Sequence, residues 1–167
     1  ISIASLPGMK ERTFTMNGMS KAYAMDGWRL GYVAAPEEYI LTMNKFHQHN
    51  TTCAPSFVQA AAIAALTQEK DEVQKMVKEY QRRRDYAVKA INEVEGISCI
   101  CPKGAFYIFI NCKSLGMKSA ELSGYLLENA KIALVPGDVF GPGGEGYLRM
   151  SFATSYDNVV EGCAKLK

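Results

Sequence analysis

The sequence has 167 residues, of which 48% are apolar and 22% are charged, and this average composition excludes collagen, coiled coils and disordered tails. The formal net charge is only +2 and the basic residues are scattered, so the sequence carries no electrostatic footprint for nucleic acid. No segment reaches the roughly 20 consecutive apolar residues that a membrane helix needs. We therefore expect a cytoplasmic protein with neither nucleic acid nor membrane as a partner.

The start of the chain and its cysteines add two expectations. The sequence begins without Met and leads directly into a turn signal at Pro7-Gly8, so we expect a piece of a longer protein. Among the five cysteines, Cys99 and Cys101 form the one close pair, and alternation along a strand would send both to the same face. A metal site there would lack its third and fourth ligands, so we expect reduced thiols and no bound metal.

The first seventy residues combine short strands with helices. The expected elements are strands over residues 13–16 and 31–35 and helices over residues 37–49 and 56–66. Asn17-Gly18 is expected to end the first strand, and Ser56 is the expected N-cap of the second helix.

The remainder of the chain begins with a long amphipathic pattern. Apolar residues recur at intervals of three, four and seven over residues 68–94, which predicts one long helix stopped by Gly96. The elements expected after it are strands over residues 97–101 and 105–111, a helix over 119–129, strands over 132–135 and 147–152, and a helix from about Tyr156. This β-β-α-β-β-α order indicates a small α+β domain.

The sharpest signal lies between residues 17 and 32, which read NGMSKAYAMDGWRLGY. Ser20-Lys21 is followed eight residues later by Arg29 within the pattern Gly-x-Arg-x-Gly-Tyr. This segment resembles the cofactor-lysine segment of the class I/II aminotransferases, which belong to fold type I of the enzymes that use pyridoxal 5′-phosphate. The resemblance extends to the C-terminal end of the chain.

The resemblance implies an α/β fold in three parts. Residues 1–70 would be the C-terminal piece of the large cofactor-binding domain of fold type I. Residues 71–95 would form a long connecting helix, and residues 96–167 a small α+β C-terminal domain.

The residue types in the motif suit the chemistry of that cofactor. Formation of a Schiff base needs a lysine amine that can lose its proton near neutral pH, and by resemblance this lysine is Lys21. The phosphate dianion needs a counter-charge, and the resemblance gives this role to Arg29, with Ser20 adding a hydrogen bond from its hydroxyl. A different interpretation makes Arg29 a surface residue paired with Asp26.

The motif departs from the family pattern at two positions. Many relatives carry a hydroxyl residue three positions before the lysine, where this chain has Gly18. Asp26 stands where a small residue or proline is more usual, and its role stays open. Neither departure changes the lysine that would hold the cofactor.

A second signal is the run GYLRMSFA over residues 146–153. On a strand, Leu148 and Met150 would share the apolar face, whereas Arg149 would point to the opposite face. In the family, an arginine of this near-terminal strand holds the α-carboxylate of the substrate, which implies a substrate-binding role for Arg149. Two turn segments, residues 102–107 and 135–141, also resemble family segments near the substrate entrance, and their aromatic residues Phe106, Tyr107 and Phe140 could be core residues, gate residues or direct contacts.

The implied function is that of an aminotransferase. It would move an amino group between an amino acid and a 2-oxo acid through a Schiff base of pyridoxal 5′-phosphate on Lys21, its catalytic residue, which is also a base for the substrate α-proton. Groups that bind the cofactor ring would lie in a missing N-terminal part of the same protein, so we expect the chain to be inactive alone. The resemblance also implies a homodimer.

Two alternatives stay open. A lyase or synthase of the same fold would use the same lysine, because the motif specifies the cofactor and not the bond that is broken. A binding domain without catalytic activity could also be built on this scaffold.

Overall fold

The computed structural model describes residues 1–68 and 70–167, and its backbone divides into two compact units. The first unit is Ile1–Gln74 and the second is Lys75–Lys167, so the division falls inside a long helix, α4 (Lys70–Asn92). The domain ranges expected from the sequence stay a prediction. None of the helices in the described ranges combines the length and the apolar content needed to span a bilayer.

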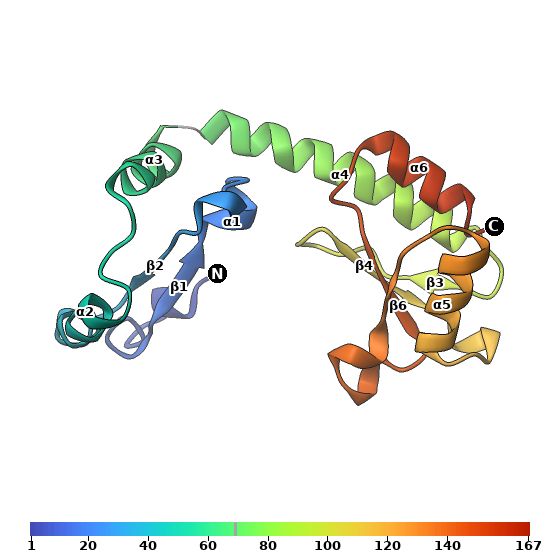
Figure 1. Ribbon diagram of the computed structural model, residues 1–167, viewed down its shortest axis with the longest axis horizontal. Helices are drawn as coiled ribbons and strands as arrows, with labels where there is room; N and C mark the ends of the chain where they lie inside the picture. The colour runs from blue at the N-terminus through green and yellow to red at the C-terminus, as the bar shows by residue number, and fades with distance from the viewer. Residues whose placement is uncertain (69) are drawn as a thin grey trace. The chain divides into compact units, whose positions relative to one another are not determined.

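The first unit contains a two-stranded antiparallel hairpin and short helices (Figure 1). Its elements in chain order are the 3-10 turns η1 (Ile3–Ser5) and η2 (Lys10–Arg12), β1 (Thr15–Gly18), α1 (Met19–Ala22), the 3-10 turn η3 (Asp26–Trp28), β2 (Gly31–Ala34), α2 (Glu37–Asn50) and α3 (Ser56–Thr67). A small core of Met19, Met25 and Ala62 is packed against partly buried residues of α3 and of the segment between the strands.

Two sequence expectations for this unit are wrong in detail. Asn17 and Gly18 do not end the first strand but belong to it, because they pair with Tyr32 and Gly31 in the antiparallel register. Ser56 is not the N-cap of α3, because Pro55 holds that position with an extended backbone and Ser56 is the first helical residue. The long helix expected over residues 68–94 corresponds to α4. Gln68 is instead the C-cap of α3, and residue 69 lies outside the described residues.

The second unit is a four-stranded antiparallel sheet whose core face is covered by helices (Figure 1). Its elements after α4 are β3 (Ser98–Cys99), β4 (Tyr107–Asn111), η4 (Lys113–Leu115), α5 (Ser119–Asn129), β5 (Val135–Pro136), η5 (Gly137–Phe140), η6 (Pro142–Gly144), β6 (Tyr147–Ser151) and α6 (Tyr156–Ala164). The strands are ordered β3-β4-β6-β5. The β-β-α-β-β-α order expected from the sequence is therefore present.

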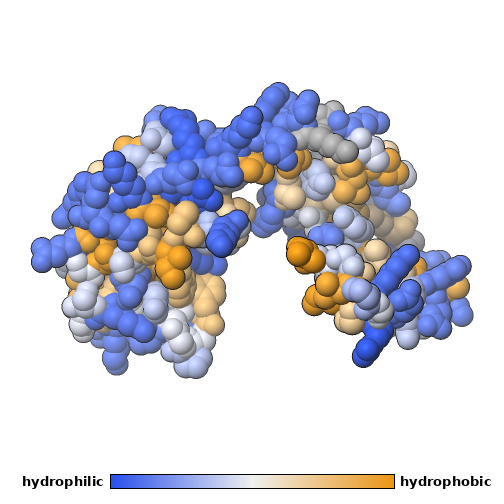
Figure 2. Space-filling model, turned by 180° about the vertical axis from the view of Figure 1, so that it is seen from behind, coloured by the Kyte–Doolittle hydropathy of each residue, from blue (hydrophilic) through white to orange (hydrophobic). Residues whose placement is uncertain are grey.

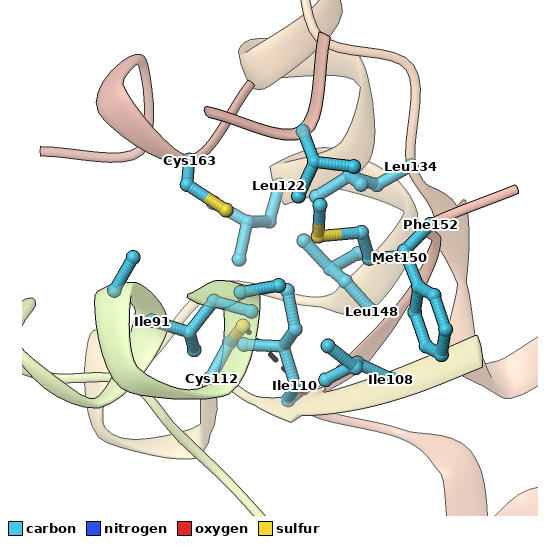
Figure 3. Packing of buried hydrophobic residues seen from close by; sticks show 13 residues of the cluster. Ile91, Ile108, Ile110, Cys112, Leu122, Leu134, Leu148, Met150, Phe152 and Cys163 are labelled. Atoms are coloured by element: carbon cyan, nitrogen blue, oxygen red, sulfur yellow. Dashed lines mark hydrogen bonds between the residues drawn. The ribbon is translucent and has the colours of Figure 1, made fainter. Parts of the chain in front are cut away.

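The core of the second unit lies between this sheet and the helices α4, α5 and α6 (Figure 3). Ile108 and Ile110 of β4 face Met150 and Leu148 of β6 across the ladder, and all four side chains are buried. Ile91 of α4 contacts the same cluster and has no exposed surface. Because successive side chains of a strand alternate, the residues between these four lie on the opposite face of the sheet.

Large apolar side chains are also exposed in both units. Met16, Phe46 and Phe57 of the first unit keep 77%, 73% and 69% of their surface, and Ile100 of the second keeps 89%. Figure 2 accordingly shows hydrophobic surface on both units.

Candidate functional site

Ser20, Lys21 and Arg29 belong to one closed loop that joins β1 to β2. The loop is closed at its base because the N–H of Met19 donates to the carbonyl of Leu30 at 3.0 Å. The hairpin continues from this point, with Gly18 paired to Gly31. A Cβ on Gly31 would lie 3.0 Å from the carbonyl oxygen of Asn17, so glycine allows the two chains to approach here.

The interior of the loop is organised around two buried methionines. Met19 is completely buried and Met25 keeps 8% of its surface, and both belong to the small core that also contains Ala62 of α3. The N–H of Met25 bonds back to the Met19 carbonyl at 3.4 Å. The apolar side chains therefore point inward, while Ser20 is partly exposed and Lys21 is exposed. Burial of the methionines thus orients the polar groups of the loop outward.

Arg29 has a left-handed backbone, with φ 54° and ψ 45°, at the end of η3. This conformation is uncommon for a residue with a side chain and is often found at functional sites. Its Nη1 donates to the main-chain carbonyl of Asp26 at 2.9 Å, which leaves other donors of the guanidinium for a second partner. In this hydrogen bond, Asp26 contacts Arg29 through its backbone carbonyl.

The donor set of the loop fits a ligand that carries both a carbonyl and a phosphate. The amine of Lys21 can react with a carbonyl, while the hydroxyl of Ser20 and the guanidinium of Arg29 are donors suited to phosphate oxygens. All three residues lie within ten positions of one closed loop.

Arg149 belongs to the second unit and lies on β6, directly opposite Phe109 of β4 and Val135 of β5. Its neighbours in sequence, Leu148 and Met150, are buried in the core, so the guanidinium lies on the other face of the sheet, as the alternation predicted. Its Nε is buried and has no hydrogen-bond partner among the residues that the structure describes. A buried charged donor without an acceptor is costly and suits an anionic ligand.

Two aromatic rings lie against the Arg149 guanidinium. The guanidinium carbon is 4.3 Å from the centre of the Tyr107 ring and 4.6 Å from the centre of the Phe140 ring. Phe106, the third aromatic residue noted in the sequence, packs against the core cluster and is 6.0 Å from Tyr80 of α4. The sequence left the roles of these three residues undecided, and the contact between Phe140 and Arg149 could not be predicted from it because the contact depends on the path of the loop.

A comparison with known proteins shows the family. The model of the aminotransferases of class I and II matches residues 2–166. The chain belongs to this family. An aspartate aminotransferase of Pyrococcus abyssi is 50% identical over 99% of the chain, and an aromatic-amino-acid aminotransferase 2 of Thermococcus litoralis is 48% identical over 99%.

A solved structure of the same class I and II family has the same fold. An aromatic aminotransferase from Pyrococcus horikoshii matches 99% of the chain with a TM-score of 0.93 and 48% identity. The aminotransferase chain described here covers only 44% of that structure, and 43% of each of the two relatives. It therefore spans less than half the length of the proteins that it matches.

Proposed function

We propose that this chain forms part of the active site of a pyridoxal-phosphate-dependent aminotransferase that moves an amino group between an amino acid and a 2-oxo acid. The observation that carries the proposal is the closed loop on which Ser20, Lys21 and Arg29 present a hydroxyl, an amine and a guanidinium. The printed names of the relatives, which are aminotransferases for aspartate and for aromatic amino acids, support it.

The loop residues would bind different groups of the cofactor. Lys21 would hold it through Nζ, and Ser20 and Arg29 would hold its phosphate by charge-assisted hydrogen bonds. When bound, pyridoxal phosphate supplies a carbonyl that takes the amine and a ring that delocalises the charge left at the substrate α-carbon. Once its amine is free, Lys21 Nζ is the base that accepts the α-proton of the substrate.

Arg149 would bind the α-carboxylate of the substrate. The support is its buried Nε, which lacks an acceptor among the described residues, and the planar fork of a guanidinium, which matches a carboxylate. The groups that contact the cofactor ring would come from the N-terminal part of the parent protein. We also propose that the parent is a homodimer.

The test of the cofactor role is chemical labelling of the parent protein. Borohydride reduction of the cofactor-loaded enzyme should leave the pyridoxyl mass on the peptide that contains Lys21. Lys21→Ala should abolish the label, whereas Lys10→Ala, which changes another exposed lysine of the first unit, should keep it. A label on any other lysine would end the proposal.

A further inference from the structure

We propose that Tyr107 and Phe140 are positioning residues that hold the Arg149 guanidinium ready for a carboxylate; this inference rests on the proposed function. Both rings contact the guanidinium carbon, at 4.3 Å and 4.6 Å from their centres. A cation close to an aromatic ring is attracted by the negative charge of its π face. The two rings therefore hold the arginine without using an anionic partner.

The rings leave the donors of Arg149 available. An acidic partner would bind the N–H groups in the guanidinium plane, which are the groups that a carboxylate needs. The ring contacts instead involve the guanidinium carbon, and Nε has no acceptor among the described residues although it is buried. The arrangement therefore holds the side chain in place by ring contacts, without an acceptor on its Nε among the described residues.

Each ring also contacts a further aromatic ring. The ring centres of Tyr107 and Phe106 are 4.5 Å apart. The Phe106 ring in turn stacks on the Tyr80 ring of the long helix α4, with 6.0 Å between the two ring centres. Phe140 is 6.1 Å from Phe109, the residue opposite Arg149 in the β4–β6 ladder. Side chains that are locked by packing support a site more rigidly than side chains that move freely.

Phe140 lies at the end of η5, in a loop whose path is set by close backbone contact. A Cβ on Gly137 would lie 2.7 Å from the carbonyl oxygen of Tyr147. The loop is therefore pressed onto the start of β6, two residues before Arg149. Phe140 still keeps 51% of its surface, so its ring can be replaced without opening the core.

The experiment compares two probes that differ in the carboxylate alone, 3-phenylpropanoate and 3-phenylpropan-1-ol. Their binding to the cofactor-loaded parent enzyme is measured by calorimetry, for the wild type and for variants. Phe140→Leu and Tyr107→Leu should each raise the Kd of the acid roughly 3- to 30-fold, which is about 0.7–2 kcal/mol at 1.4 kcal/mol per tenfold. The Kd of the alcohol should stay within about twofold.

The conservative variants and a control separate positioning from general packing. Phe140→Tyr and Tyr107→Phe keep the rings and should restore wild-type affinity for the acid. Tyr125→Leu removes an exposed ring of α5 and should change neither probe. In steady-state kinetics, the two ring-removing variants should raise KM for the amino acid more than they lower kcat. If Tyr107→Leu does not fold, the result for Phe140→Leu alone tests the positioning role.

Arg149→Leu distinguishes the two levels of the proposal. If it abolishes the preference for the acid while the ring-removing variants keep it, the carboxylate role stands and the positioning role is wrong. If Arg149→Leu keeps that preference, or if the wild type binds the acid no better than the alcohol, the proposed role of Arg149 fails and the inference fails with it.

Discussion

At the scale of single residues, the buried Nε of Arg149 is the feature with the clearest energetic consequence. Removing one partner of a desolvated charge pair typically costs about 2–5 kcal/mol, because the other charge stays buried and unpaired. Arg149→Ala in the parent enzyme should therefore lower kcat/KM for the amino acid by about 30-fold to a few thousand-fold. Lysine restores the charge without the two-pronged geometry, so Arg149→Lys should recover only part of the loss.

The measurement for Arg149 combines steady-state kinetics with the absorbance of the bound cofactor. The cofactor should be retained in both variants, because its proposed partners Lys21 and Arg29 lie in the other unit. Loss of the cofactor, or an unchanged kcat/KM in Arg149→Ala, would make Arg149 a structural residue of β6.

At the scale of elements, the loop between β5 and β6 depends on close backbone packing at Gly137. A Cβ there would overlap the carbonyl oxygen of Gly144 and lie 2.7 Å from that of Tyr147, whereas a Cβ on Gly143 would meet no atom within 4 Å. Gly137→Ala should therefore destabilise the protein by about 1–3 kcal/mol, as overpacking usually does. Gly143→Ala is the matched control, and urea unfolding of both variants checks the difference. Equal urea midpoints for the two variants would show that the loop shifts to accommodate the added methyl group of Gly137→Ala.

The beginning of α5 supplies a pH-dependent element. The backbone N–H of Ser119 donates to Glu145 Oε1 at 2.8 Å, and this bond is the main cause that lowers the pKa of the Glu145 carboxyl. A carboxyl whose pKa is lower in the folded state contributes stability above its unfolded pKa and loses it as the pH falls through the folded value. That contribution should therefore decrease progressively as the pH falls below about 4.5.

The variant Glu145→Gln isolates this contribution, because glutamine keeps an acceptor oxygen without the titrating group. Urea midpoints measured between pH 7 and pH 3 should fall more steeply for the wild type than for the variant in the acidic range. Parallel curves of urea midpoint against pH would mean that the Glu145 carboxylate does not contribute to the acid sensitivity of the protein.

The elements also show where sequence reasoning succeeds and where it stops. The helix over residues 119–129 was predicted at both ends, because its apolar periodicity is local. The strand expected over 132–135 is only Val135–Pro136, because Lys131 adopts φ 57° and the N–H of Ile132 turns back to Leu126. Neither lysine nor isoleucine is a residue type that predicts such a turn. The strand expected over 97–101 is only Ser98–Cys99, where the Asn92 side chain bonds both backbone groups of Cys99.

The same limit applies to the candidate site. The segment from Lys21 to Arg29 was singled out by its resemblance to the family motif, which lies within a short stretch of sequence, and alternation along β6 correctly predicted that Arg149 lies on the face opposite the core. The contact between Arg149 and Phe140 joins residues of two elements through a loop of 3-10 turns. No periodic pattern encodes such a path.

At the scale of the whole molecule, the chain covers 43% of its aminotransferase relatives and divides into two units. The partners of the cofactor ring would lie in the N-terminal part of the parent protein. We therefore expect the purified 167-residue chain to show no transamination in a coupled assay of 2-oxo acid formation. The parent enzyme is the positive control, and measurable turnover by the isolated chain, with its mass verified, would contradict this division.

The loop that carries Lys21 and Arg29 also contains the single tryptophan of the chain, Trp28. Its indole keeps 45% of its surface and lies 6.3 Å from the Phe57 ring of α3. All of the intrinsic indole fluorescence of these 167 residues therefore originates one position from Arg29. The indole emission of the chain is thus a local optical probe of this loop, and it reports on the environment of Trp28 without an attached dye.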